Sequence, residues 1–598
     1  LQYALLHATG YDVSIEDLKN FRQLGSKLPG HPESNLTPGI EVTTGPLGQG
    51  VANAVGVAVA EANLAARFNK PDAPKIVDHY TYCIAGDGCM MEGLSNEASS
   101  LAGHWGLGKL ILFYDDNKIS IDGDTKLAFT EDVSKRYKAL GWHTLHVEDG
   151  HTNVDGIRNA IQEAQSVKDR PTLIKLSTII GFGAPNKAGG HDVHGAPLGV
   201  EETQLAREAL GWQHAEFEVP QDVYDIYRQG LTEGAKEECK WAADLEEYGN
   251  KYPREHDEFK ALMDNKLPDL DAVLPIFTPG DKGLATRQHS QTMLNAIAPS
   301  LPGLIGGSAD LAVSNLSLVK MYGDFQKGQY EGRNLRFGVR EHGMAAICNG
   351  IALYGMGLIP YCATFFNFTD YMRGAMRLSS LSHAGVIYVL THDSIGLGED
   401  GPTHQPVEQL ASFRSMPNTL VVRPAGGNET AGAYKVAVAN RSRPTLITLS
   451  RQAMPNTPEH TRMHCTGVMR GAYIVREADS HPDVLLMATG SELQLAYDAA
   501  EDLSRMGVQA QVVSMVCWEL FEEQDQEYKN RVLPPDVDAR VSVEASVPFG
   551  WAQFLGAKGR HVGIPNEFGT SGPTAKVYQY FGITVDNIVK AAMEQMPQ

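Results

Sequence analysis

The chain has 598 residues, more than one hydrophobic core can organise, so we expect three to five structural units. Apolar residues make up 42% and charged residues 21% of the chain, the balance of a folded globular protein. The formal charge of -21 argues against a nucleic-acid partner, because phosphate backbones are bound by clustered Lys and Arg. No apolar run reaches the roughly 20 residues that a membrane-spanning helix needs, so no membrane partner is expected.

The first ten residues are typical of the end of an amphipathic helix that stops at Gly10. The sequence does not begin with Met and shows no targeting segment. We therefore expect a leading segment to precede Leu1 and regard the first domain as incomplete at its N-terminus.

Short apolar runs alternate with helical patterns between residues 41 and 175. The predicted strands are 80–85, 110–114 and 171–176, and the clearest helices are 51–67 and 154–165. Such alternation predicts a parallel sheet covered by helices on both faces. A polar stretch over residues 201–271 then predicts closing helices and a linker.

The same alternation returns twice in the rest of the chain. A second set of strands is predicted at 304–307, 358–363, 386–390, 420–423 and 445–449. A third set begins at Asp483 and continues with a helix, two more strands and a terminal helix over residues 584–595. The fold class is therefore α/β, with three consecutive doubly wound domains and mainly parallel sheets. We place these domains at residues 1–255, 256–460 (with the preceding linker) and 461–598.

Oxygen-bearing side chains follow two neighbouring predicted strands. Gly86-Asp87-Gly88 ends the first, and Asp115-Asp116-Asn117-Lys118-Ile119 ends the next. A right-handed crossover brings both ends to one sheet edge, where α/β sheets bind ligands. The Asp87 carboxylate, the Asn117 amide and a backbone carbonyl near Ile119 suit Mg²⁺ or Ca²⁺, with diphosphate oxygens and water completing the shell. A Gly-Asp-Gly run alone is more often a plain turn.

Two further motifs are open to more than one interpretation. The glycines of Thr43-Thr-Gly45-Pro46-Leu47-Gly-Gln-Gly50 precede a helix and could face an anion or the thiazolium side of a cofactor, or simply form a helix-start turn. In Phe337-Gly-Val-Arg-Glu341-His, the carboxyl group of Glu341 suits a hydrogen bond to an aminopyrimidine ring if it is buried. A surface Arg-Glu helix start is the alternative. Thr489-Gly-Ser-Glu492 could seat an anion at a helix start, although a turn is the simpler interpretation.

Taken together, these motifs resemble transketolase over essentially the whole chain, and the sequences around Asp324 and Cys517 resemble its plant and algal plastid type. The resemblance implies a thiamine-diphosphate-binding (PP) domain, a pyrimidine-binding (Pyr) domain and a C-terminal transketolase domain. It implies a homodimer with active sites between subunits, and the chloroplast stroma (otherwise the cytoplasm) as the compartment. The implied pathways are the Calvin cycle and the pentose phosphate pathway.

The implied reaction is the reversible transfer of a two-carbon ketol (glycolaldehyde) unit through a thiamine diphosphate carbanion or enamine. The donor is a ketose phosphate such as xylulose 5-phosphate, and the acceptor an aldose phosphate such as ribose 5-phosphate. Both are sugar phosphates, so the acidic chain needs a local basic pocket for them.

The resemblance also implies roles for individual residues. The metal ligands are Asp87, Asn117 and Ile119. The cofactor contacts are Gly45, Pro46, Leu47, Gly88, Asn117, His194, Phe365 and Glu341. Substrate contacts are His31, His194, Arg287, Ser314, His392, Asp400, His404 and Arg451, and the catalytic group is Glu341, His404, His31 and His194. Glu92 and Glu97 match acidic residues of a proton relay between the two active sites, although both also fit a solvated helix face.

Three alternatives remain on the sequence. Another thiamine-dependent enzyme, a phosphoketolase or deoxyxylulose-phosphate synthase, is disfavoured by the Gly396-Leu-Gly-Glu-Asp400-Gly-Pro-Thr-His404 run. A non-catalytic transketolase-like protein is disfavoured by the presence of Glu341, Asp87 and Asn117. A zinc site at His191 and His194 lacks further ligands at suitable spacing.

Overall fold

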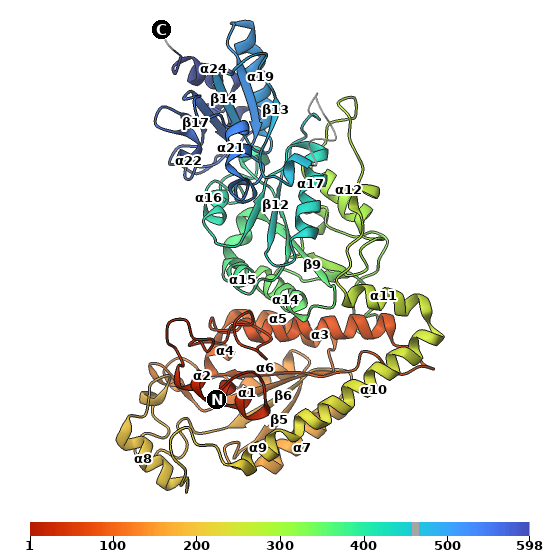
Figure 1. Cartoon of the computed structure of the whole chain (residues 1–598), viewed down its shortest axis with the longest axis vertical. Helices are drawn as coiled ribbons and strands as arrows, with labels where there is room; N and C mark the ends of the chain where they lie inside the picture. Colours follow the sequence, from red (N-terminus) through yellow and green to blue (C-terminus); the bar gives the residue numbers. More distant parts are fainter. Residues whose placement is uncertain (457–465, 597–598) are drawn as a thin grey trace. The chain divides into compact units, whose positions relative to one another are not determined.

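The computed structural model describes residues 1–456 and 466–596 and contains the three predicted α/β sheets (Figure 1). The described chain divides into two compact units. Unit 1 holds the first sheet and comprises residues 1–264, 324–332 and 342–358; unit 2 holds the second and third sheets and comprises the remainder. The predicted domain boundary between residues 460 and 461 lies outside the described residues.

The sheet of unit 1 has four parallel strands in the order β1-β2-β6-β5. Their bounds are β1 Thr81–Gly86, β2 Leu110–Asp116, β6 Thr172–Ser177 and β5 His143–Val147. β1, β2 and β6 match the predicted strands, but β5 was not predicted. It is an edge strand whose residues are mostly only partly buried, and its two histidines interrupt the apolar run that a prediction needs.

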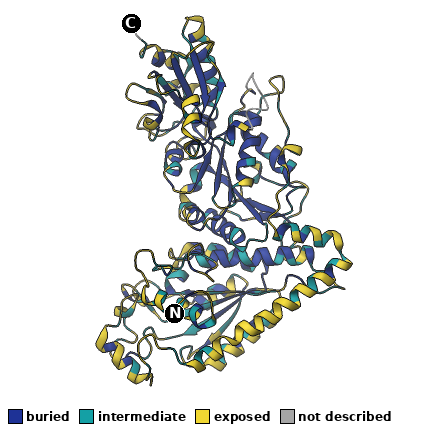
Figure 2. Ribbon diagram, in the orientation of Figure 1, coloured by how far each residue is buried: buried dark blue, intermediate teal, exposed yellow. Residues whose placement is uncertain are grey.

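Helices cover this sheet and extend beyond it. They are α1 Gln2–Thr9, α2 Ile15–Lys19, α3 Gln49–Phe68, α4 Asp87–Met91, α5 Gly93–Trp105, α6 Val133–Ala139, α7 Val154–Ser166, α8 Val200–Ala209, α9 Gln221–Tyr227, α10 Gln229–Lys251 and α11 Pro253–Met263. Short strands β3 (Ile119–Ser120) and β4 (Gly123–Asp124) form a separate hairpin. The polar stretch after residue 200 is helical as predicted, and α10 is exposed along most of its length (Figure 2). No helix of the described chain is both long enough and apolar enough to cross a bilayer.

Close contact between α3 and α14 (Glu341–Tyr354) joins two distant parts of the sequence within unit 1. A Cβ atom on Gly56 would lie 2.1 Å from the carbonyl oxygen of Ile347, and one on Gly350 would lie 2.1 Å from that of Asn53. Only glycine therefore permits this approach of the two backbones. The Asn53 amide also donates a hydrogen bond of 2.8 Å to the carbonyl of Ala346. These contacts fix α14, at whose first position Glu341 stands.

Unit 2 contains a six-stranded sheet of parallel strands in the order β11-β12-β10-β9-β7-β8. Their bounds are β7 Leu304–Ser308, β8 Asn334–Arg336, β9 Ile359–Phe365, β10 Ile387–Thr391, β11 Leu420–Val422 and β12 Thr445–Leu449. The accompanying helices are α12 Thr286–Ile297, α13 Ala312–Asn315, α15 Thr369–Leu381, α16 Gln409–Arg414 and α17 Gly426–Ala439. The five predicted strands are present, and the three-residue strand β8 was missed because it is too short to show a pattern.

The third sheet has the order β13-β15-β14-β16-β17, and β13 runs antiparallel to β15. Its strands are β13 Tyr473–Arg476, β14 Val484–Ala488, β15 Ala510–Ser514, β16 Arg540–Glu544 and β17 Arg560–Gly563. Its helices are α19 Glu492–Arg505, α20 Trp518–Glu522, α21 Gln526–Val532, α22 Ala552–Leu555, α23 Thr574–Tyr580 and α24 Val585–Met593. The prediction of two strands after β14 was wrong: three follow it, and the polar strand β17 is the one without an apolar run.

A buried histidine in the second domain is expected to make the protein sensitive to acid. His289 on α12 is 0% exposed, its ring packs edge-on against Phe277 with 4.5 Å between centroids, and neither ring nitrogen has a hydrogen-bond partner in the described structure. Burial lowers the pKa of His289 to about 4. In the unfolded chain the histidine has a pKa of about 6.5. Between about pH 6.5 and 4 the unfolded chain therefore binds a proton at this histidine, whereas the folded chain does not. Stability is therefore lost as pH falls from about 6.5 towards 4.

We expect His289→Phe to reduce this acid sensitivity, because phenylalanine keeps the ring and has no site to protonate. The slope of unfolding free energy against pH should fall by up to ~1.4 kcal/mol per pH unit between these limits. Denaturant unfolding at several pH values measures it. The exposed His383, at φ 55, provides the control His383→Asn, which should leave the slope unchanged. An identical slope in both variants would contradict the prediction.

Candidate active site

An oxygen-rich cluster lies at the carboxyl edge of the first sheet. Strands β1 and β2 pair so that Gly86 stands opposite Asp115, which places Asp87 beside the end of β2. The Asp87 side chain is 4% exposed and accepts hydrogen bonds from the Tyr114 hydroxyl (2.6 Å) and the Lys118 backbone N–H (3.0 Å). The two predicted strand ends therefore meet, as the crossover argument requires.

Negative charge accumulates at this edge. Burial raises the pKa of Asp87, and the neighbouring carboxylates of Asp116 and Asp115 raise it further. Asp116 pairs with Lys175 at 3.0 Å, whereas both hydrogen bonds to Asp87 come from neutral donors. The Asn117 amide oxygen accepts the N–H of Ile119 at 3.0 Å. A divalent cation with oxygen ligands would offset the charge that burial makes costly on Asp87.

Within the described residues there is no group of three or more His, Cys, Asp or Glu side chains arranged to hold a metal ion. The predicted set differs from such a group because it has one carboxylate, one amide and one backbone carbonyl. It therefore needs ligands from outside the protein, such as diphosphate oxygens and water, to complete a shell of six.

The glycine-rich loop before α3 lies against this cluster. Leu47 contacts Gly88, where a Cβ atom would lie 2.8 Å from the leucine Cδ1. Gly48 caps α3 at φ 81 and faces Glu92, and Gly45 lies beside His31. Leu47 is 51% exposed, and His31, Pro46 and Glu92 are also exposed. The loop thus presents an open surface beside Asp87, with glycine where close approach is needed.

Glu97 and His194 are two further predicted residues of unit 1. Glu97 on α5 is half-buried and accepts the backbone N–H of Gly343 at 2.7 Å. His194 is exposed in the loop after β6, directly behind the single turn His191–Val193. Among the described residues, no hydrogen bond or ion pair links the His194 ring to Asp87 or Asn117.

A second cluster lies at the carboxyl edge of the second sheet in unit 2. Phe365 ends β9, and His392 directly follows the adjacent strand β10; their rings lie 5.0 Å apart. The ring of His404 lies 6.0 Å from that of Phe365. His392 is 3% exposed, and its Nδ1 has no hydrogen-bond partner in the described structure. A buried polar atom without a partner is costly unless a ligand supplies one.

Positive charge surrounds His392. Burial lowers the pKa of His392 to about 3, and Arg287, Arg451 and His404 lower it further. Arg287 donates to the carbonyl of Ser314 at 2.6 Å, and burial together with Arg451 lowers its own pKa. Arg451 donates to the carbonyl of Leu397 at 3.1 Å. Two guanidinium groups beside a neutral histidine form the local basic pocket that an acidic protein needs for an anionic substrate.

Three other predicted residues belong to unit 2, namely Ser314, Asp400 and Glu341. Ser314 is on α13 and is half-buried, and Asp400 is exposed in the turn that follows Glu399. Glu341 is 9% exposed at the start of α14, and burial raises its pKa. Burial thus makes the protonated form of this carboxyl group easier to reach and favours sharing a proton with a neighbouring base.

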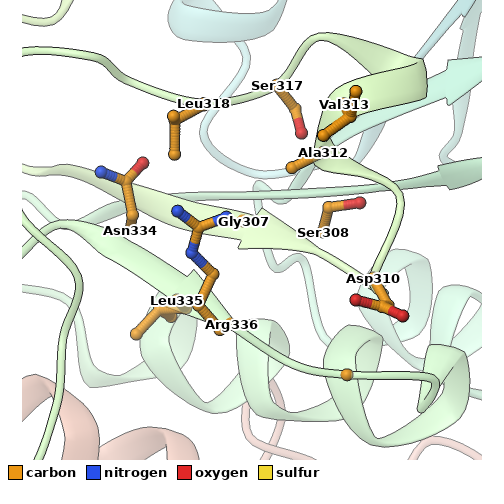
Figure 3. A pocket seen from close by; sticks show the side chains of 11 residues that line it. Gly307, Ser308, Asp310, Ala312, Val313, Ser317, Leu318, Asn334, Leu335 and Arg336 are labelled. Carbon is orange, nitrogen blue, oxygen red and sulfur yellow. The ribbon is translucent and has the colours of Figure 1, made fainter.

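Sequence analysis missed a cavity of about 130 Å³ beside the second sheet (Figure 3). Residues of β7, α13, β8 and the loops beside them line it, including Ser308, Asp310, Asn334 and Arg336. Asp310 has φ 60, a left-handed conformation that few residues other than glycine adopt. The glycines at the end of β7 give no signal for this cavity, because a Cβ atom on Gly306 or Gly307 would lie 1.9 or 1.8 Å from the carbonyl oxygen of Tyr361 or Leu335 on a neighbouring strand.

Comparison with known proteins yields three family matches. Residues 1–268 match the transketolase thiamine diphosphate binding domain, residues 282–457 the transketolase pyrimidine binding domain, and residues 471–584 the transketolase-like C-terminal domain. Chloroplastic transketolase-1 of Arabidopsis thaliana is 61% identical over 99% of this chain and 80% of that protein. Chloroplastic transketolase of Solanum tuberosum is 60% identical, also over 99% of this chain and 80% of that protein.

Solved structures give the same result. Transketolase from Leishmania mexicana is 47% identical and superposes with a TM-score of 0.95, covering 99% of this chain and 87% of that one. Transketolase from Pichia stipitis in complex with sedoheptulose 7-phosphate is 46% identical with a TM-score of 0.96, covering 99% and 87% of the two chains.

Proposed function

Since this chain belongs to the transketolase family, we propose that the polar cluster of unit 1 is a cofactor site and that the polar cluster of unit 2 is a substrate site. The chain is a transferase of the transketolase type. It moves a two-carbon ketol unit reversibly from a ketose phosphate to an aldose phosphate with thiamine diphosphate as cofactor. The family matches favour transketolase over the alternatives of phosphoketolase and deoxyxylulose-phosphate synthase.

The cluster of unit 1 is the proposed metal and diphosphate site. Asp87, Asn117 and the carbonyl of Ile119 would hold Mg²⁺, or Ca²⁺ in its place. The exposed face of the loop Gly45-Pro46-Leu47, together with Gly88 and His194, would contact the cofactor. The buried carboxylate of Asp87, which has only neutral hydrogen-bond donors, supports this assignment. Thiamine diphosphate supplies an electron sink for the bond beside the donor carbonyl.

We expect Asp87→Asn to weaken Mg²⁺-dependent cofactor binding by about 100-fold or more, because the amide keeps the shape but removes the charged ligand. Calorimetric titration with thiamine diphosphate, with and without Mg²⁺, measures the change. Asp122→Asn, at an exposed aspartate of the β3–β4 turn, is the matched control. Binding by Asp87→Asn that depends on Mg²⁺ as strongly as in the unaltered chain would rule out the proposed metal site.

The cluster of unit 2 is the proposed sugar-phosphate and pyrimidine site. Arg287, Arg451, Ser314 and His392 would bind the substrate phosphate. The observation that carries this proposal is the buried His392, whose Nδ1 has no hydrogen-bond partner in the described structure and whose pKa is lowered by burial and by Arg287 and Arg451. Phe365 would stack on the pyrimidine ring, and Glu341 would hydrogen-bond to it and hold the proton.

The remaining substrate residues are proposed to act on the sugar itself. His404 with His31 and His194 would exchange protons with the substrate hydroxyl and carbonyl groups, and Asp400 would bind a hydroxyl. Their exposed or half-buried rings can reach a ligand without rearrangement of the core.

We further propose that two copies of the chain share these sites, with Glu92 and Glu97 in the proton relay between them. Sedimentation tests this, since a fully active monomer is incompatible with it. The proposed compartment is the chloroplast stroma, supported by the chloroplastic relatives and testable by plastid fractionation. The domain boundaries 1–255, 256–460 and 461–598 are likewise proposals that limited proteolysis tests.

A further inference from the structure

The segment that carries three proposed substrate residues rests on the third domain. Residues 392–404 hold His392, Asp400 and His404. Thr574 at the start of α23 donates to the carbonyl of Gly396 at 3.1 Å. The Gln405 side chain donates to the carbonyls of Gly398 (2.8 Å) and Thr570 (3.0 Å), which joins the segment to the third domain. The third domain therefore supports this segment directly.

A buried ion network makes the strongest of these connections. Arg423, which follows β11, is 0% exposed, and its Nε donates to the carboxylate of Asp393 at 2.9 Å. Its Nη1 donates to the Thr489 hydroxyl at 2.9 Å and to the Glu492 carboxylate. Asp393 directly follows His392 in the chain. The guanidinium thus links the third domain to the residue beside the proposed phosphate ligand.

Glu492 is held firmly on its own side of the network. It accepts the Tyr578 hydroxyl at 2.7 Å and the Ala545 backbone N–H at 3.0 Å. Nearby, Glu544 forms two hydrogen bonds with Arg414, at 2.7 and 2.8 Å. Because every carboxylate here has fixed donors, the guanidinium has one well-defined position.

Gly490, in the Thr489-Gly-Ser-Glu492 motif, leaves the space that the Arg423 guanidinium occupies. Gly490 has φ 52, and a Cβ atom there would lie 2.8 Å from the Nε of Arg423. The motif therefore receives a cation from the second domain, rather than the anion considered from the sequence. Any larger residue at position 490 would displace the guanidinium.

We propose that Glu492 is a positioning residue for the sugar-phosphate site, acting through Arg423 and Asp393 on His392. The inference rests on the proposed role of His392 and gives the third domain a part in substrate binding. Arg287 and Arg451 stand on other elements, α12 and the end of β12. A shift of His392 alone would spoil its alignment with them, and binding groups need placement within about 0.5 Å.

The test compares two donors in Glu492→Gln, which keeps the shape of the side chain and removes its charge. We expect KM for xylulose 5-phosphate to rise by roughly 5- to 20-fold, with kcat within about twofold. KM for erythrulose, a ketose donor without phosphate, should change by less than about twofold. A loss of folded protein would lower kcat for both donors and leave both KM values unchanged, so the two effects are separable.

Glu429→Gln is the matched control. Glu429 is 0% exposed and also joins the second and third domains, accepting the Tyr473 and Ser514 hydroxyls, each at 2.7 Å. It makes none of the contacts to residues 392–404 described above. Equal effects of Glu429→Gln and Glu492→Gln on the ratio of the two KM values would overturn the proposal.

Two more variants keep the result interpretable. If Glu492→Gln does not fold, Tyr578→Phe removes one neutral donor to the same carboxylate. We then expect KM for the phosphorylated donor alone to rise by about threefold.

Arg451→Ala tests the phosphate site itself. If Arg451→Ala leaves the KM ratio unchanged, the proposed phosphate site fails; if it changes the ratio while neither Glu492→Gln nor Tyr578→Phe does, only the positioning role fails.

Discussion

Replacing Glu341 with glutamine is expected to lower kcat by about 100- to 10,000-fold, the usual contribution of a positioned acid or base. Glu341 is 9% exposed, and burial raises its pKa, so its carboxyl group can hold and share a proton. Glutamine keeps the size and a hydrogen bond but cannot transfer that proton. Steady-state assays with xylulose 5-phosphate and ribose 5-phosphate measure the loss.

The loss should concern chemistry and not binding. Calorimetry should show thiamine diphosphate affinity within about threefold of the unaltered chain, because one neutral hydrogen bond replaces another. Proton exchange on the bound cofactor, followed by NMR, should slow in parallel with kcat. Glu331→Gln, at an exposed glutamate ten residues earlier, should leave both quantities unchanged. A Glu341→Gln variant that retained more than about a tenth of kcat would exclude the proposed role.

The fold was predictable wherever a strand is a buried apolar run. Strands β7, β9, β10, β12 and β14 are buried at every position, and all were predicted. Strands β5, β8, β13 and β17 were missed. They are short, half-exposed or polar, and their pairing depends on neighbours distant in sequence, which residue patterns alone do not reveal.

The site was predictable to different extents in the two units. The meeting of the two strand ends, where the Lys118 N–H donates to Asp87, follows from a single crossover between neighbouring strands, so local sequence was sufficient for it. Arg287, His392 and Arg451 stand far apart in the chain, and only the family resemblance suggested that they act together. Arg423 gave no signal at all, because its partners come from separate loops and helices without any periodic spacing.

Replacing Arg423 with methionine is expected to destabilise the protein by about 3–5 kcal/mol, the typical cost of breaking a buried ion pair from one side. Methionine fills much of the same space but leaves Asp393 and Glu492 buried without their cation. Thermal unfolding should show a midpoint lower by on the order of 10 °C. Arg505→Met breaks only exposed pairs, those with Asp502 and Glu501, and should cost less than about 1 kcal/mol.

The pH dependence of this loss identifies its cause. Burial already raises the pKa of Asp393 and the Arg423 guanidinium lowers it, so removing Arg423 should raise the pKa of this carboxyl further above that of the unfolded chain. A raised carboxyl pKa favours the folded state at low pH, and that advantage disappears as pH rises through the folded value. Arg423→Met should therefore be less damaging at pH 5 than at pH 8, and adding Glu492→Gln should recover part of the stability because one uncompensated charge is gone. A loss independent of pH would instead assign the effect to packing around the methionine, and the charge network would then contribute little to holding the two domains together.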